Sequence, residues 1–170
     1  MTARNECKEL LTRYAIARIP FIALHTVERG RALHLLKEVA TDLSLPICVH
    51  TLSKGVYDLM TDKVISEDKS IYGAMDYMSE QMRRRQNLTL ILTEIPDLTS
   101  DSSDARQLLD LVTLASETGG AVIVFTQSAV WNRLQRLGLM LSLPLPDEDE
   151  MAAPIRRYID DYRTEITIEW

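Results

Sequence analysis

The sequence predicts an α/β domain in which a parallel sheet lies between two layers of helices. Short, continuous apolar runs, such as that from Phe21 to Leu24, are typical of strands that are covered on both faces. Segments with helical periodicity alternate with these runs at short spacing, which favours parallel crossover connections. The 170 residues suffice for one domain with a substantial core. We therefore predict a single three-layer α/β/α domain over 1–170.

The first half of the chain begins with a helix at about 4–18, where Leu10, Leu11 and Tyr14 belong to an apolar stripe. A strand over 21–24 follows. Apolar residues at helical spacing then indicate a helix over 28–44 and, after a proline, a second strand over 47–52. The stretch 53–68 is less regular, and its Ser-Lys-Gly sequence indicates a turn. We assign no strand to it.

The second half continues the alternation of helices and strands. A helix over 70–86 precedes a third strand over 88–95, and a polar loop leads into a helix over 103–118. Gly119 and Gly120 end that helix, because glycine readily adopts the left-handed conformation of a helix C-terminus. A fourth strand, a short helix, a fifth strand and a last helix are expected at 121–127, 131–137, 139–145 and 147–163.

Composition excludes several classes of protein. The formal net charge of −6 argues against broad nucleic-acid binding, which needs a basic face. Two distant cysteines, Cys7 and Cys48, are typical of a reduced intracellular protein. No segment has the ~18 consecutive apolar residues of a membrane span, and the N-terminus lacks the apolar core of a signal peptide. We expect a cytoplasmic protein that binds neither nucleic acid nor membrane.

The stretch from Ala121 to Glu150 resembles the second half of an AAA+ ATPase core. An apolar strand ends in a small polar residue, a short helix with arginines follows, and the next strand runs into PLPDEDE. LILTEIPDL lies where that family has its acidic Walker B strand, and FIALHTVERGRA lies where it has its phosphate loop. The chain is most similar to the N-terminal module of a cyanobacterial and plastid AAA ATPase family, in which the first module lacks the phosphate loop.

The resemblance implies a P-loop-like, AAA-type domain with a five-stranded parallel sheet. Counting the five strands along the sequence, it implies the order 5-1-4-3-2, with TEITIEW at 164–170 outside this order. The last helix corresponds to the one that leads to the helical lid of AAA+ proteins. The resemblance therefore suggests the N-terminal domain of a longer bacterial ATPase, or a lidless protein.

The phosphate-loop position lacks the groups that bind phosphate. A loop of the form GxxxxGK(S/T) wraps phosphates with backbone N–H groups and supplies a lysine. Here TVERGR stands in its place, with one glycine, Gly30, and without lysine. Glu28 places a carboxylate near the positive end of the helix dipole, where a phosphate would have to lie. Two anions ~4 Å apart repel by about 1 kcal/mol even in water. We expect no bound cofactor.

The Walker B and sensor positions are also altered. The resemblance aligns the metal-binding aspartate with Thr93, the glutamate that acts as a base with Glu94, and the sensor residue with Thr126. A threonine without a partner carboxylate is a poor magnesium ligand, and the histidines do not fall at metal-ligand spacing. We expect no catalytic residue and no metal site.

Two other functions stay open at this stage. One is a regulatory domain that binds nucleotide at an unconventional phosphate site through Arg29 and Arg31. The other is a small α/β enzyme that uses the acid pair Glu94 and Asp97. A nucleotide titration tests the first function, and a substrate screen with a Glu94→Gln control tests the second.

The favoured function is a non-catalytic interaction or assembly module. In AAA+ proteins the segment that corresponds to 131–137 carries an arginine finger, which stabilises phosphoryl charge in a neighbouring site. Trp131, Arg133 and Arg136 lie in this segment, and Trp and Arg are enriched among the residues that dominate interface energy. We predict an interface there with an AAA+ ATPase module, a ring neighbour or a protein client.

Overall fold

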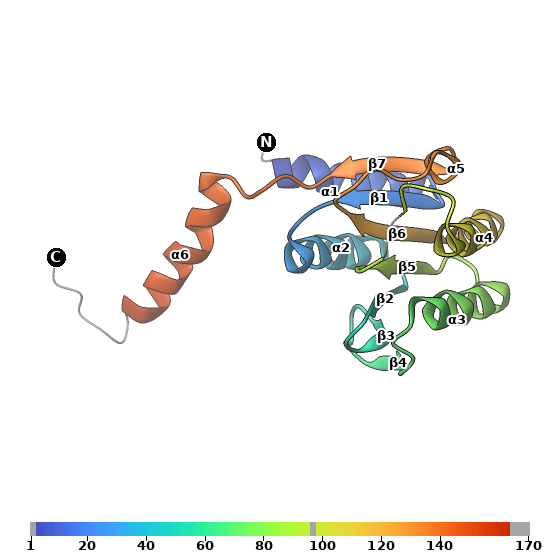
Figure 1. Ribbon diagram of the computed structural model, residues 1–170. Helices are drawn as coiled ribbons and strands as arrows, with labels where there is room; N and C mark the ends of the chain where they lie inside the picture. Colours follow the sequence, from blue (N-terminus) through green and yellow to red (C-terminus); the bar gives the residue numbers. More distant parts are fainter. Residues whose placement is uncertain (1–2, 96–97, 164–170) are drawn as a thin grey trace.

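Figure 1 shows a computed structural model of the chain, which describes residues 3–95 and 98–163. One sheet carries helices on both of its faces. In chain order the elements are α1 (Ala3–Ile16), β1 (Phe21–His25), α2 (Arg29–Leu43), β2 (Ile47–Thr51), β3 (Gly55–Asp58), β4 (Val64–Ser66), α3 (Ile71–Arg84), β5 (Thr89–Leu92), α4 (Ser103–Thr118), β6 (Ala121–Thr126), α5 (Asn132–Gln135), β7 (Gly138–Ser142) and α6 (Glu148–Arg163).

In the described residues the sheet has seven strands in the order β4-β3-β2-β5-β6-β1-β7. The β2–β5, β5–β6, β1–β6 and β1–β7 pairs are parallel, whereas β2–β3 and β3–β4 are antiparallel. The five strands expected from the sequence are β2-β5-β6-β1-β7 in this sheet. The prediction of a five-stranded, wholly parallel sheet is nevertheless wrong, because the sheet is mixed and has two further strands.

The two additional strands form a meander in the stretch 53–68, to which the sequence analysis assigned none. Gly55 starts β3 with a φ of 78°, and a Cβ at this position would lie 2.3 Å from the Ser66 carbonyl oxygen. Val56 and Tyr57 are buried, but Val64 and Ile65 in β4 are exposed at the edge of the sheet. Strands of four and three residues are too short for a clear alternation of apolar and polar residues.

Two apolar cores lie on opposite faces of the sheet. The helices α1 and α2 cover one face, where Ile22 and Leu24 point, and α3, α4 and α5 cover the other, where Phe21 and Ala23 point. Successive side chains of a strand alternate between faces, so β1 contributes to both cores. The predicted three-layer α/β/α arrangement is confirmed.

Local signals set the ends of several helices. The Ser102 hydroxyl accepts a hydrogen bond from the Ala105 N–H at 3.1 Å, which caps the start of α4. Gly119 ends α4 with a φ of 70°, so the predicted helix over 103–118 is confirmed. Ser70 caps α3 in the same way, through the N–H of Gly73.

The last helix, α6, extends away from the sheet (Figure 1). The stretch 164–170, predicted to lie outside the central strand order, falls outside the described residues. Among the helices that the structure describes, none combines the length and apolar character needed to cross a membrane.

Candidate functional site

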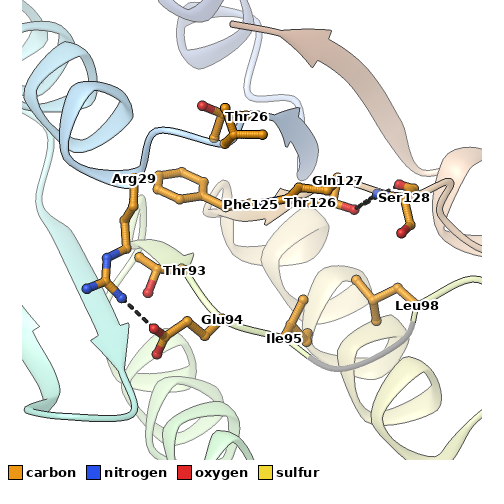
Figure 2. Close-up of a pocket in the computed structure, with 11 residues that line it drawn as sticks. Thr26, Arg29, Thr93, Glu94, Ile95, Leu98, Phe125, Thr126, Gln127 and Ser128 are labelled. Atoms are coloured by element: carbon orange, nitrogen blue, oxygen red, sulfur yellow. Dashed lines mark hydrogen bonds and ion pairs between the residues drawn. The ribbon is translucent and has the colours of Figure 1, made fainter.

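A cavity of about 650 Å³ opens beyond the carboxyl ends of β1, β5 and β6. Parallel α/β sheets bind ligands at this edge. Figure 2 shows that polar residues line the cavity at all three strand ends, with Thr26 and Arg29 after β1, Thr93 and Glu94 after β5, and Thr126 at the end of β6. The cavity therefore lies where a domain with a parallel sheet would hold a ligand.

The connection between β1 and α2 is too short to wrap a phosphate. It consists of Thr26, Val27 and Glu28 alone. The buried Thr26 donates its N–H to the Thr126 carbonyl at 3.2 Å, and its hydroxyl accepts the Glu28 N–H at 3.1 Å. A phosphate loop needs a longer run whose N–H groups converge on the anion. Here the backbone N–H groups of Thr26 and Glu28 are already bound to the protein.

Glu28 and Arg31 belong to an ion-pair cluster at the start of α2. Glu28 is the N-cap residue, and its carboxylate accepts a hydrogen bond from Arg31 at 3.0 Å rather than from the helix backbone. Arg31 also pairs with Glu150 of α6 and donates to the Pro144 carbonyl. The Arg31 and Glu150 side chains are only 16% and 13% exposed. Arg31 thus anchors the start of α6 and is engaged before any ligand arrives.

Arg29 lies at the mouth of the cavity and pairs with Glu94. Its guanidinium is 2.6 Å from one Glu94 carboxylate oxygen, and the Leu52 N–H donates to the other oxygen at 3.1 Å. Figure 2 shows the Arg29 side chain reaching from α2 toward the end of β5. Both side chains are more than 40% exposed, so the pair contributes little stability. The Glu94 carboxylate neutralises the Arg29 guanidinium, the cation that could otherwise bind a phosphate.

The hydroxyls of the two threonines at the strand ends are both bound to the main chain. The Thr93 hydroxyl donates to the His50 carbonyl at 3.0 Å and is buried. The Thr126 hydroxyl donates to the Ser128 carbonyl at 2.8 Å and accepts the Ser128 N–H at 3.1 Å. Each hydroxyl proton is therefore given to a backbone oxygen.

The charge around the start of α2 opposes anion binding. Arg29 and Arg31 bring two positive charges, whereas Glu28, Glu94 and Glu150 bring three negative ones. One net negative charge remains where a nucleotide would place several more. The sequence did not indicate the pairing of Glu150 with Arg31, because the two residues are 119 positions apart.

Of the acid pair considered for an enzyme, the structure describes Glu94. Glu94 is engaged with Arg29 and Leu52, and Asp97 falls outside the described residues. The two thiols offer no ready nucleophile. Burial raises the pKa of both Cys7 and Cys48 to about 11, so both remain protonated near neutral pH.

The predicted interface segment is partly exposed. The Trp131 ring packs against the core on the α3/α4 face, and the backbone N–H of Trp131 donates to the Leu98 carbonyl at 2.6 Å. The Arg133 guanidinium lies 5.4 Å from the centre of the Trp131 ring, within the range of a cation–π interaction. Arg133 and Arg136 are both exposed. The segment thus presents two guanidinium groups and a partly exposed aromatic ring.

Comparison with protein families identifies a match over most of the chain. The family described as the N-terminal domain of SpoVK-like AAA ATPases matches residues 7–143. Among curated proteins, none matches this sequence.

Solved structures show the same fold. A chain of the E. coli MS115-1 HORMA:CdnC:Trip13 complex superposes with a TM-score of 0.62 at 13% identity, covering 97% of this chain and 69% of its own length. Trip13 from Rhizobiales superposes with a TM-score of 0.53 at 18% identity, covering 92% of this chain and 56% of its own length. AMPPCP-bound DnaA from Aquifex aeolicus superposes with a TM-score of 0.57 at 10% identity, covering 100% of this chain and 54% of its own length. The chain thus spans about half the length of the last two proteins.

Proposed function

Because this chain belongs to the family of SpoVK-like AAA ATPase N-terminal domains, we propose that it is a non-catalytic module that acts by binding an AAA+ partner. The partner is an AAA+ ATPase module or a ring neighbour, with a client protein as a further ligand. The proposal treats 1–170 as one module of a larger ATPase assembly. The chain would then correspond to the first module of an AAA ATPase family in which that module lacks the phosphate loop.

One observation carries the non-catalytic part of the proposal. The connection from β1 to α2 consists of Thr26, Val27 and Glu28, and its polar groups bind one another and β6. The two nearby arginines are both paired with carboxylates. Binding a triphosphate would require breaking these ion pairs and bringing further negative charge beside Glu28.

We expect the isolated chain to bind Mg-ATP with a dissociation constant of about 1 mM or weaker, and to release no phosphate from it. The physical reason is the absent lysine and the carboxylate at the start of α2. Isothermal titration calorimetry measures the binding, and a phosphate-release assay measures hydrolysis. DnaA from Aquifex aeolicus, whose structure holds AMPPCP, serves as the positive control.

A micromolar dissociation constant would contradict this expectation. In that case the Arg29→Gln variant identifies the site, because Arg29 lines the cavity and faces Glu94. Loss of binding in this variant would establish the alternative function, a regulatory domain with an unconventional phosphate site.

For the partner surface we propose the exposed arginines beside Trp131. Arg136→Ala is expected to weaken association at least tenfold while the melting temperature changes by no more than a few degrees, because an exposed side chain adds little to folding. Sedimentation velocity measures association, with the chain alone for a ring neighbour and with an AAA+ module carrying GxxxxGK(S/T) for an ATPase partner.

Two variants serve as controls for this measurement. Arg83→Ala removes an exposed arginine from the end of α3 and should leave association unchanged. Trp131→Ala should lower both association and stability, since the ring is half-buried against the core. Equal association of the Arg136→Ala and Arg83→Ala proteins would exclude this surface.

A further inference from the structure

A second cavity, of about 430 Å³, lies at the opposite end of the sheet. It is bounded by the last turns of α1 and α2 and by the amino ends of β1, β2, β5 and β6. Its volume falls in the range of small-molecule sites. No residue that lines it also lines the cavity beside Glu94.

The floor of this second cavity is apolar. Leu11 of α1, Ile22 of β1, Val39 of α2 and Ile47 of β2 are all buried and line it. Ile16 lies among its lining residues and is 66% exposed. An apolar chain that lay in the cavity would contact these residues and would be partly removed from water, which favours binding.

One charged group borders this apolar space. Arg18 is the single ionisable residue that lines the cavity, and no ion pair engages it within residues 3–95 and 98–163. Arg18 is exposed to solvent and its guanidinium lies near Gly119, as does the side-chain oxygen of Asn87, and Gln86 is another lining residue. The cavity thus combines an apolar interior with an unpaired cation and two amide groups.

The helix ends that face the cavity do not cancel this charge. The Ala40 carbonyl near the end of α2 accepts hydrogen bonds from the N–H groups of Ser44 and Leu45. The Ala115 carbonyl near the end of α4 accepts from Gly119 and Gly120. These two carbonyls are already hydrogen-bonded, and Arg18 carries the only full charge among the described residues that line the cavity.

We propose that this cavity is a binding site for a medium-chain fatty carboxylate. The hydrocarbon chain lies along the apolar floor between α1 and α2, and the carboxylate pairs with the Arg18 guanidinium. A guanidinium and a carboxylate form charge-assisted, often bidentate hydrogen bonds, which select an acid over an alcohol or an amine of the same length. The site is independent of the AAA+ partner proposed above.

The test compares three probes with the same alkyl chain, decanoate, decanol and decylamine, each kept below its micelle concentration. Binding is followed by backbone amide shifts in NMR titrations of the whole chain. We expect decanoate to bind about tenfold tighter than decanol or more, because it gains the ionic hydrogen bonds, and decylamine to bind more weakly than either. The shifted amides should be those of residues that line this cavity.

Charge variants identify the group that binds the carboxylate. Arg18→Gln should reduce the affinity for decanoate at least tenfold and leave that for decanol unchanged, and Arg18→Lys should restore part of the loss. Arg13→Gln removes the same charge from an exposed position of α1 and is the matched control. Ala15→Leu, which fills the cavity from α1, should abolish binding of all three probes.

Equal affinities for decanoate and decanol would overturn the proposal, as would decanoate binding that survives Arg18→Gln. Absence of shifts with decanoate in the unmodified protein would also overturn it. Circular dichroism of each variant establishes that it is folded, and the decanol affinity of the Arg18→Gln protein separates loss of charge from loss of the cavity.

Discussion

Replacing Arg31 by Met is expected to lower the free energy of unfolding by roughly 2–4 kcal/mol, because it leaves the partly buried Glu150 carboxylate without its partner. Arg31 pairs with Glu28 and Glu150 and also donates to the Pro144 carbonyl. The other Glu150 carboxylate oxygen, Oε1, is buried and has no hydrogen-bond partner in the described part of the chain. Urea denaturation measures the loss of stability. Hydrogen exchange should show faster opening at the first turn of α6.

A double variant separates the ion pair from general packing. In Arg31→Met with Glu150→Met, neither partner leaves an unpaired charge behind, so much of the lost stability should return. Arg84→Met removes an arginine from the exposed pair with Glu80 and should cost less than about 0.5 kcal/mol. The anchoring role of Arg31 would be refuted if Arg31→Met cost no more than Arg84→Met.

Gly138→Ala is expected to destabilise the protein by about 2–4 kcal/mol, because β7 lies too close to β1 for a side chain at this position. A Cβ on Gly138 would lie 1.9 Å from the Phe21 carbonyl oxygen, a backbone atom of the strand with which β7 pairs. The substitution would push β7 outward and with it the segment that leads to α6. Thermal and urea unfolding measure the effect.

Gly30→Ala is the matched control, and it should change the stability in the opposite direction. Gly30 lies in the first turn of α2, where a Cβ would meet no atom within 4 Å. Alanine favours a helix over glycine by up to about 1 kcal/mol, so we expect a small gain in stability. Similar destabilisation by both substitutions would contradict the close-contact explanation for Gly138.

Much of the fold could be predicted from local patterns. Apolar runs placed β1 and β6 within a residue or two, and helical periodicity with Gly119 after it placed α4. The strands β3 and β4 could not be predicted in this way. These short segments have no clear period. They become strands because β3 pairs with β2 and β4 pairs with β3, and because the glycine at position 55 lets the Ser66 carbonyl approach.

The candidate site could also be predicted only in part from the sequence. The sequence alone shows that a phosphate-binding lysine is absent and that the carboxylate of Glu28 lies at the helix start. The partners of the two nearby arginines could not be predicted. Arg29 finds Glu94 across 65 positions and Arg31 finds Glu150 across 119. Such distant pairs leave no periodic signal, because each position by itself resembles an ordinary charged residue at a helix end.

The sequence by itself determined the α/β class, the layers and the absence of a GxxxxGK(S/T) motif after the first strand, because each depends on residues that are neighbours along the chain. Tertiary structure alone decided three other features. It brought Arg31 to Glu150, it placed Gly138 against the Phe21 carbonyl, and it opened an apolar cavity beside Arg18. The physical reason is that ion pairs, close backbone contacts and cavities depend on distances between segments, which are set only when the strands pair and the helices pack on the sheet.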